Sequence, residues 1–201
     1  MQTASGTPLS GSEPSEPSEP TQQSQPDQPD QHGDSPPGRR RLALFVVVAA
    51  VVYALDVFTK VIAVEALSGR APVSVIGDLL ELRLTRNPGA AFSLGTSATL
   101  ALSLVSLVVV CVVAWLGRRV VSPVWAVALG LLLGGAAGNL TDRIARHPAP
   151  EEMLQGHVVD FLELPNWPVF NVADSAIVVA ATLIIVQSFR GVQMDGRKAK
   201  S

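Results

Sequence analysis

Four apolar stretches constrain the fold of this chain more than any other feature of its sequence. We expect them to form membrane-spanning helices at about residues 42–64, 98–116, 123–141 and 172–189, because each approaches the roughly 20 residues that a helix needs to cross a bilayer core. The composition agrees, since 48% of the residues are hydrophobic and 16% are charged. That balance is too apolar for an ordinary soluble domain. The predicted fold class is an all-α membrane protein with four transmembrane helices.

The two ends of the chain differ in composition from its middle. Residues 1–38 are rich in Pro, Ser and Glu, with six acidic residues and no Lys or Arg before Gly38, and we expect a disordered tail. The remaining chain carries 15 basic and 11 acidic residues. Basic clusters at 39–41, at 118–119 and in a C-terminal tail, 191–201, would all lie on one side of four spans. This side is predicted to be cytoplasmic, with both termini, and residues 39–190 form one domain.

The segment between the first two spans changes its hydrophobic period. Leu80, Leu82 and Leu84 alternate with polar residues, which is typical of a half-buried strand. We therefore expect a small extracytoplasmic β-sheet at about residues 71–94. The topology also places residues 143–170 on this outer side, where Trp167 and several prolines favour a loop at the headgroup level.

Polar residues interrupt the ends of the third and fourth spans. Asn139, Asp142 and Arg143 share one helical face, and Asn171 and Asp174 share another. An ionisable residue at such a depth is a functional-site hypothesis because its desolvation is expensive. Arg143 can pair with one buried carboxylate, and Asp142, its neighbour in sequence, is a candidate for this partner. If these two pair, Asp160 and Asp174 are left without an obvious cation.

Asp160 lies in an apolar stretch of the outer segment, between Val159 and Phe161. If it meets Asp174 at low dielectric, the two acids cannot both ionise easily, so one keeps a proton and the other acts as a base toward water. The alternative is a solvated loop charge. Asn87, before Pro88, is either an ordinary turn residue or a part of the same outer face.

Two further features have a structural and a functional interpretation. Asp56 and Lys60, at i and i+4 in the first span, can form an ion pair at the membrane boundary or take part in a site. Gly134, Gly135 and Gly138 give the third span a flat side, which either a neighbouring helix or a lipid-bearing ligand can approach.

Other chemistries lack support in the sequence. The three histidines are scattered, the single cysteine lies in an apolar run, and no phosphate-cradling loop or Gly-x-Ser-x-Gly occurs. A transporter whose acids relay protons and a structural assembly factor remain as alternatives. The transporter predicts polar residues along the whole bilayer depth, whereas the second span and the middle of the fourth are almost bare of them.

Five motifs, in one order across about residues 42–190, together resemble the signal peptidase II family, the bacterial prolipoprotein signal peptidases (peptidase family A8). They are Asp56-Val57-Phe58-Thr59-Lys60, Arg86-Asn87-Pro88-Gly89-Ala90-Ala91-Phe92-Ser93, the segment Gly134–Arg143, Val158-Val159-Asp160-Phe161 and Phe170-Asn171-Val172-Ala173-Asp174-Ser175. The resemblance implies a four-helix intramembrane aspartyl protease in the bacterial cytoplasmic membrane. This protease would cut a prolipoprotein on the amino side of a cysteine that carries a diacylglyceryl group.

By motif match, the resemblance implies that Asp160 and Asp174 form the catalytic dyad. It implies no metal or other cofactor, a site toward the outer face, and the lipid-modified precursor and membrane phospholipid as partners. Nucleic acid is not a partner, and we expect a monomer. The residues that would line the site and hold the substrate backbone are Asn87, Asn139, Arg143 and Asn171. Those that would support it are Asp142, beside Arg143, with Asp56 and Lys60 ordering the first helix near the sheet.

Overall fold

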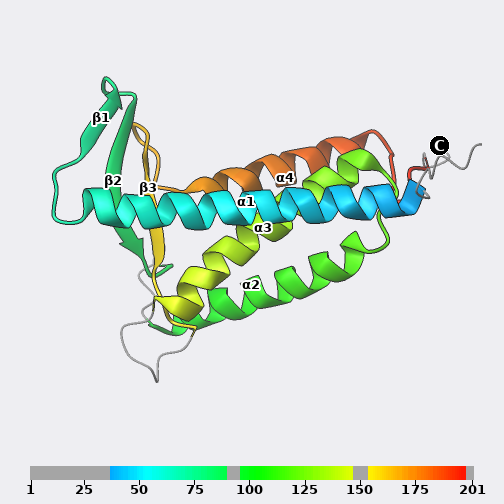
Figure 1. Cartoon of the computed structure of the whole chain (residues 1–201), viewed down its shortest axis with the longest axis horizontal. Helices are drawn as coiled ribbons and strands as arrows, with labels where there is room; N and C mark the ends of the chain where they lie inside the picture. The colour runs from blue at the N-terminus through cyan, green and yellow to red at the C-terminus, as the bar shows by residue number, and fades with distance from the viewer. Residues whose placement is uncertain (1–36, 90–95, 147–153, 198–201) are drawn as a thin grey trace, which may run out of the picture. The chain divides into compact units, whose positions relative to one another are not determined.

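The computed structural model describes residues 37–89, 96–146 and 154–197, so the tail predicted before residue 37 lies outside the described residues. Within these ranges the chain forms helices α1 (Pro37–Leu67), α2 (Thr96–Gly117), α3 (Pro123–Ala145) and α4 (Val172–Phe189), and strands β1 (Val73–Ile76), β2 (Leu80–Asn87) and β3 (Val158–Glu163). All four helices are long and apolar enough to cross a membrane. Figure 1 shows them running side by side, with the sheet at one end of the bundle, here called the sheet end. The predicted fold class is confirmed.

The helix lengths fit a bilayer. The shortest, α4, has 18 residues and is therefore about 27 Å long at ~1.5 Å per residue. The first helix extends beyond the expected residues 42–64 at both ends. It begins at Pro37, a residue type favoured at the first helical position. It ends just before Gly69, whose φ of +69° suits a glycine after a helix terminus.

Helix α3 lies at the centre of the bundle and contacts the other three helices. A Cβ atom on Gly134 would collide with the backbone carbonyl of Ala49 in α1, and one on Gly135 would collide with the carbonyl of Ala173 in α4. These glycines therefore allow close helix contact. Of the two interpretations of the flat side, the structure favours a neighbouring helix.

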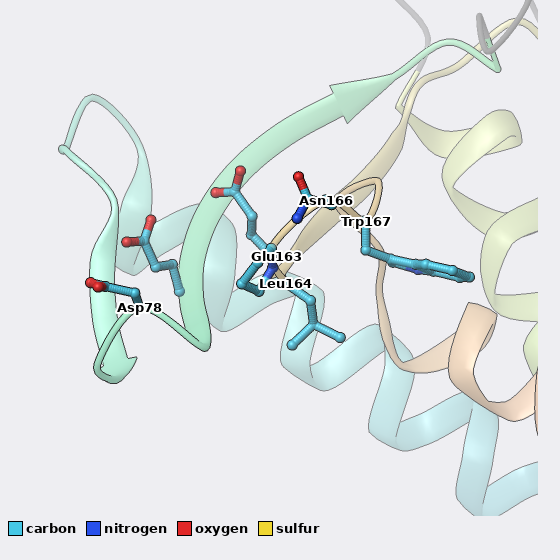
Figure 2. Close-up of a pocket in the computed structure, with 7 residues that line it drawn as sticks. Asp78, Glu163, Leu164, Asn166 and Trp167 are labelled. Carbon is cyan, nitrogen blue, oxygen red and sulfur yellow. The ribbon is translucent and has the colours of Figure 1, made fainter.

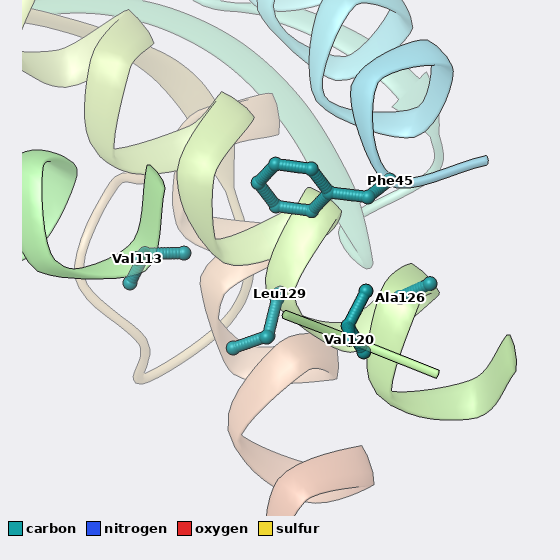
Figure 3. Packing of buried hydrophobic residues seen from close by; sticks show 5 residues of the cluster. All are labelled: Phe45, Val113, Val120, Ala126 and Leu129. Carbon is teal, nitrogen blue, oxygen red and sulfur yellow. The ribbon is translucent and has the colours of Figure 1, made fainter. Parts of the chain in front are cut away.

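A hydrophobic cluster fills the end of the bundle opposite the sheet. Figure 3 shows its buried members, which are Phe45, Val113, Val120, Ala126 and Leu129. The segment after α4 closes this end, because the carbonyl of Met194 accepts hydrogen bonds from the N–H groups of Val121 and Ser122, just before α3. The core thus fixes the helices far from the polar residues of interest.

The sheet contains a strand that the sequence did not predict. Its order is β1-β2-β3, antiparallel throughout, and β3 comes from the segment that we expected to be a loop. Thr85 of β2 lies opposite Asp160 of β3. Val159 and Phe161, on either side of Asp160, pack against the last turns of α1. Because side chains alternate along a strand, Asp160 faces the other way, and it belongs to a buried strand, not to a solvated loop.

Candidate active site

Asp160 is held by two carboxamides from different parts of the chain. Its side chain is buried, with the residue 1% exposed. Asn87, at the end of β2, donates from Nδ2 to Oδ2 of Asp160 at 3.0 Å, and Asn171 donates from Nδ2 to Oδ1 at 2.6 Å. The pairing of β2 with β3 places Asn87 beside β3. Of its two interpretations from the sequence, the structure therefore favours a part in the site, because Asn87 contacts Asp160.

Asp174 is fixed at the start of α4 by a capping box. Asn171 is the N-cap residue, and its Oδ1 accepts from the backbone N–H of Asp174 at 2.9 Å. In return, the backbone N–H of Asn171 donates to Oδ2 of Asp174 at 3.2 Å. Oδ1 of Asp174 accepts a further hydrogen bond from Nδ2 of Asn139 at 2.8 Å. The carboxylate therefore sits at the positive end of the helix dipole with a donor on each oxygen.

One residue, Asn171, links the two aspartates. Its side chain caps the helix that carries Asp174 and donates to Asp160. It also donates to Oδ1 of Asn139 at 3.1 Å. Residues from β2, β3, α3 and α4 thus form one continuous hydrogen-bond network around the two acids.

The orientation of each carboxamide in this network is set by a second partner. The backbone N–H of Gly89 donates to Oδ1 of Asn87 at 2.8 Å, so the NH₂ group of Asn87 must point to Asp160. Asn171 is fixed in the same way by the N–H of Asp174. An amide turned over would place oxygen against a carboxylate and leave the backbone donor without an acceptor. Each asparagine therefore presents donors to an acid.

Lys60 forms a buried ion cluster beneath this network. It is 0% exposed, and its Nζ lies 2.8 Å from Oδ2 of Asp56, 3.0 Å from Oδ2 of Asp142 and 2.8 Å from Oδ1 of Asn139. The predicted pair of Asp56 and Lys60 is present. It does not lie at an exposed boundary, because Asp56 is also 0% exposed and accepts from the N–H of Ala173 in α4.

The candidate pairing of Asp142 with Arg143 is wrong. Consecutive residues on a helix point in different directions, and Asp142 turns toward Lys60, toward Nε of Arg146 at 2.5 Å and toward the N–H of Val159 at 3.1 Å. Asp142 therefore ties α3 to α1 and to β3. Arg146 is a residue that the sequence interpretation missed, although its i, i+4 spacing from Asp142 was a signal for it.

Arg143 keeps a free donor near the two acids. Its guanidinium donates to the carbonyl of Asn139 at 3.4 Å, and within the described residues its Nε is buried without a hydrogen-bond partner. Its charge interacts with those of Asp174 and Asp160. An unpaired buried N–H group is costly unless a ligand satisfies it.

The environment of Asp160 moves its pKa toward neutrality. Burial raises the pKa of Asp160 to about 6, and the charge of Asp174 adds to this effect, against the hydrogen bonds from Asn87 and Asn171 and the charge of Lys60. A carboxyl group that holds a proton near neutral pH can act as a general acid. Among the described residues, no group of three or more His, Cys, Asp or Glu side chains could hold a metal ion.

Among the described residues, two cavities flank the sheet, and neither is lined by the two aspartates. One, of about 240 Å³, is lined by acidic residues and the loop after β3, and Figure 2 shows Asp78, Glu163 and Asn166 around it. The other, of about 160 Å³, is apolar and lies between α1 and the sheet. The candidate site is therefore defined by its hydrogen-bond network and not by either cavity.

Comparison with known proteins gives a consistent family. The family described as signal peptidase (SPase) II matches residues 48–190. The chain is 52% identical over 170 residues to a lipoprotein signal peptidase of Mycobacterium avium (strain 104), covering 84% of this chain and 91% of that protein. It is 51% identical over 170 residues to one of Rhodococcus jostii (strain RHA1), covering 83% and 84%.

Solved structures share the fold. One described as a bacterial membrane enzyme has a TM-score of 0.64 at 23% identity and covers 79% of this chain and 94% of its own. A second with the same description has a TM-score of 0.65 at 25% identity and covers 74% and 94%. The family match includes both aspartates and the whole hydrogen-bond network around them. The chain belongs to the signal peptidase II family.

Proposed function

We propose that this chain is an aspartic endopeptidase that removes the signal peptide of prolipoproteins on the amino side of a diacylglyceryl-modified cysteine. The substrate class follows the relatives, which are named lipoprotein signal peptidases. The observation that carries the mechanism is the network that joins Asp160 and Asp174 through Asn171. It holds two acids in unlike surroundings, one on a buried strand and one at a helix N-terminus, which is the arrangement that separates an acid from a base.

In the proposed reaction, Asp174 is the base and Asp160 is the acid. A water molecule between them gives a proton to Asp174 as its oxygen bonds to the scissile carbonyl carbon, and Asp160 protonates the carbonyl oxygen. The resulting gem-diol collapses when the C–N bond breaks. Asp174 then passes its proton to the leaving nitrogen, and a gem-diol hydroxyl returns a proton to Asp160. Both acids end in their starting states, with no covalent enzyme intermediate.

Arg143 and Asn87 are suited to hold the substrate backbone. The free Nε of Arg143 is a donor for a peptide carbonyl near the dyad. Asn87 is the last residue of β2, beyond the part of this strand that pairs with β1. An extended peptide offers carbonyl and N–H groups that can form hydrogen bonds with these two side chains. Asp142 and Lys60 would act behind them by holding α1, α3 and β3 together.

The proposed orientation in the bacterial cytoplasmic membrane follows the positive charges. Arg118 and Arg119 connect α2 to α3, at the opposite end from the sheet, and Arg190 and Arg197 follow α4. Basic residues near span ends favour the cytoplasmic side. Both termini would then be cytoplasmic and the site would lie toward the outer face, where translocated precursors emerge. We expect a monomer in phospholipid, with no cofactor.

A conducting role for the same acids finds less support. Asp160, Asp174 and their asparagine partners gather where the helices meet the sheet, while the opposite end of the bundle is filled by the apolar cluster of Figure 3. Proton or cation pathways need polar groups along the bilayer depth. This gathering favours a site over a path.

The proposal is tested with the purified full-length chain and a diacylglyceryl-modified precursor, followed by the mobility shift on cleavage. Asp160→Asn and Asp174→Asn should each abolish cleavage while the protein still folds, because each removes one of the two proton-transfer groups. Asp78→Asn, which changes an exposed carboxylate in the turn between β1 and β2, is the matched control and should cleave normally. Normal turnover by either dyad variant would refute the mechanism. Normal turnover by the variant with both replacements would show that the two acids have only a structural role.

A further inference from the structure

The buried ammonium of Lys60 brings helix α1 into the network around Asp174. Its Nζ makes three contacts: it lies within ion-pair distance of Asp56 and Asp142, and it donates a hydrogen bond to Oδ1 of Asn139. An ammonium group has donors only. Its ion pairs explain its stability in the bundle. The third contact goes to a neutral side chain that in turn donates to Asp174.

The contact between Lys60 and Asn139 decides which end of the Asn139 carboxamide faces Asp174. A donor-only group accepts no hydrogen bond, so the amide must turn its oxygen to Lys60, at 2.8 Å, and its NH₂ group to Asp174, also at 2.8 Å. Asn171 supports the same orientation from 3.1 Å. With the amide reversed, an oxygen would face a carboxylate and an NH₂ group would face an ammonium, and both contacts would be repulsive.

We propose that Lys60 is a positioning residue for the reaction: through the Asn139 carboxamide it holds a hydrogen-bond donor on Asp174 and so fixes the position of that carboxylate in the dyad. This inference rests on the proposed function. It adds the third member of a pattern, because Gly89 orients Asn87 and the backbone of Asp174 orients Asn171. In each case a fixed donor turns an asparagine so that its NH₂ group meets an acid.

Charged groups from α1, α3 and β3 surround Lys60 and Asp174. Lys60 faces Asp56 from its own helix and Asp142 from α3. Asp174 interacts with Arg143 of α3 and with Asp160 of β3. Burial is the largest influence on the pKa of Asp160 and raises it, while the charge of Lys60 lowers it. Removal of Lys60 therefore raises the pKa of Asp160, and the acid limb of the pH profile should move to higher pH.

The test avoids leaving a buried charge without a partner. In the double variant Lys60→Met/Asp56→Asn, one positive and one negative charge are removed together, and Asp142 keeps Arg146 and the N–H of Val159. The reference is the single variant Asp56→Asn, which retains the contact between Lys60 and Asn139. Both are compared as full-length proteins in lipid, on a diacylglyceryl-modified precursor, over a range of pH.

Relative to Asp56→Asn, the double variant should show a kcat lower by about tenfold to a hundredfold, the loss expected for one hydrogen bond to a charged group. KM should change by less than about twofold, because Lys60 does not touch the substrate. The acid limb should move up by about one pH unit. If Lys60 acts through Asn139, its replacement should lower kcat much less when Asn139→Leu is already present.

Three kinetic results would overturn the inference: an unmoved acid limb, a change confined to KM, or equal effects of the Lys60 replacement with and without Asn139→Leu. Thermal unfolding of each variant identifies a folding defect, and equal loss of kcat and folded protein would also reject a positioning role. Cleavage of the precursor by the unsubstituted chain tests the proposed function independently of Lys60. If the unsubstituted chain does not cleave the precursor, or if Asp160→Asn does cleave it, the proposed function is wrong whatever the Lys60 variants show.

Discussion

Replacing Asp160 by asparagine should stabilise the folded chain at neutral pH while it abolishes activity. The pKa of Asp160 is raised by burial from 3.8 to about 6, so between these values the native state binds more protons than the unfolded state. The free energy of unfolding must then fall as the pH rises through this window. A difference of about two pH units corresponds to a penalty of about 3 kcal/mol above pH ~6.

Asparagine avoids this penalty but gives up one contact. Its Oδ1 can still accept from Nδ2 of Asn171, whereas its NH₂ group would face the NH₂ group of Asn87, whose orientation Gly89 fixes. That lost hydrogen bond costs about 1 kcal/mol. The net expectation is a gain of about 1–2 kcal/mol at pH 7–8. Near pH 4 it is a loss of somewhat less than about 1 kcal/mol, because wild-type Asp160 is protonated in the native state and partly protonated in the unfolded state, so most of the penalty is absent.

The measurement is the thermal unfolding midpoint of both proteins in the same lipid or detergent at pH 4 and pH 8. At roughly 2–4 °C per kcal/mol, Asp160→Asn should unfold a few degrees higher than wild type at pH 8 and lower at pH 4. Asp78→Asn, with an exposed carboxylate, should show no such reversal. A difference between Asp160→Asn and wild type that is the same at both pH values would refute the reasoning, because only a titrating buried acid makes it depend on pH.

Three further outcomes test other parts of the structure. Gly138→Ala should lower the unfolding midpoint and the activity together, because its Cβ would collide with Oδ2 of Asp56 and displace the buried ion cluster; an unchanged midpoint would mean that α1 and α3 can separate freely there. Asn87→Ala should shift the pH profile upward, since its hydrogen bond lowers the pKa of Asp160, and a downward shift would contradict that contact. A chelator should leave the rate of precursor cleavage unchanged, and a chelator-sensitive rate that zinc restores would point to metal chemistry.

The local features of the site could be predicted from the sequence. The helices follow from the lengths of the apolar runs. The pair of Asp56 and Lys60 depends on i, i+4 spacing, and the capping box of Asn171 and Asp174 depends on i, i+3 spacing. These relations involve residues within one helical turn, so the order of residues along the chain is enough to establish them.

The contacts between distant segments could not be predicted in this way. Three of these contacts depend on how complete helices and strands pack. Strand β3 pairs with β2 although α2 and α3 lie between them in the sequence. Asp142 turns to Lys60 and not to Arg143, and Asn139 joins Lys60 to Asp174.

The sequence by itself therefore determined the four spans and was enough to select Asp160 and Asp174 as the candidate dyad. The tertiary structure alone decided which partner holds each acid and how each amide is turned. The physical reason is that a spacing fixes the face of an element on which a side chain lies, whereas the group opposite that face is set by the packing of the whole bundle.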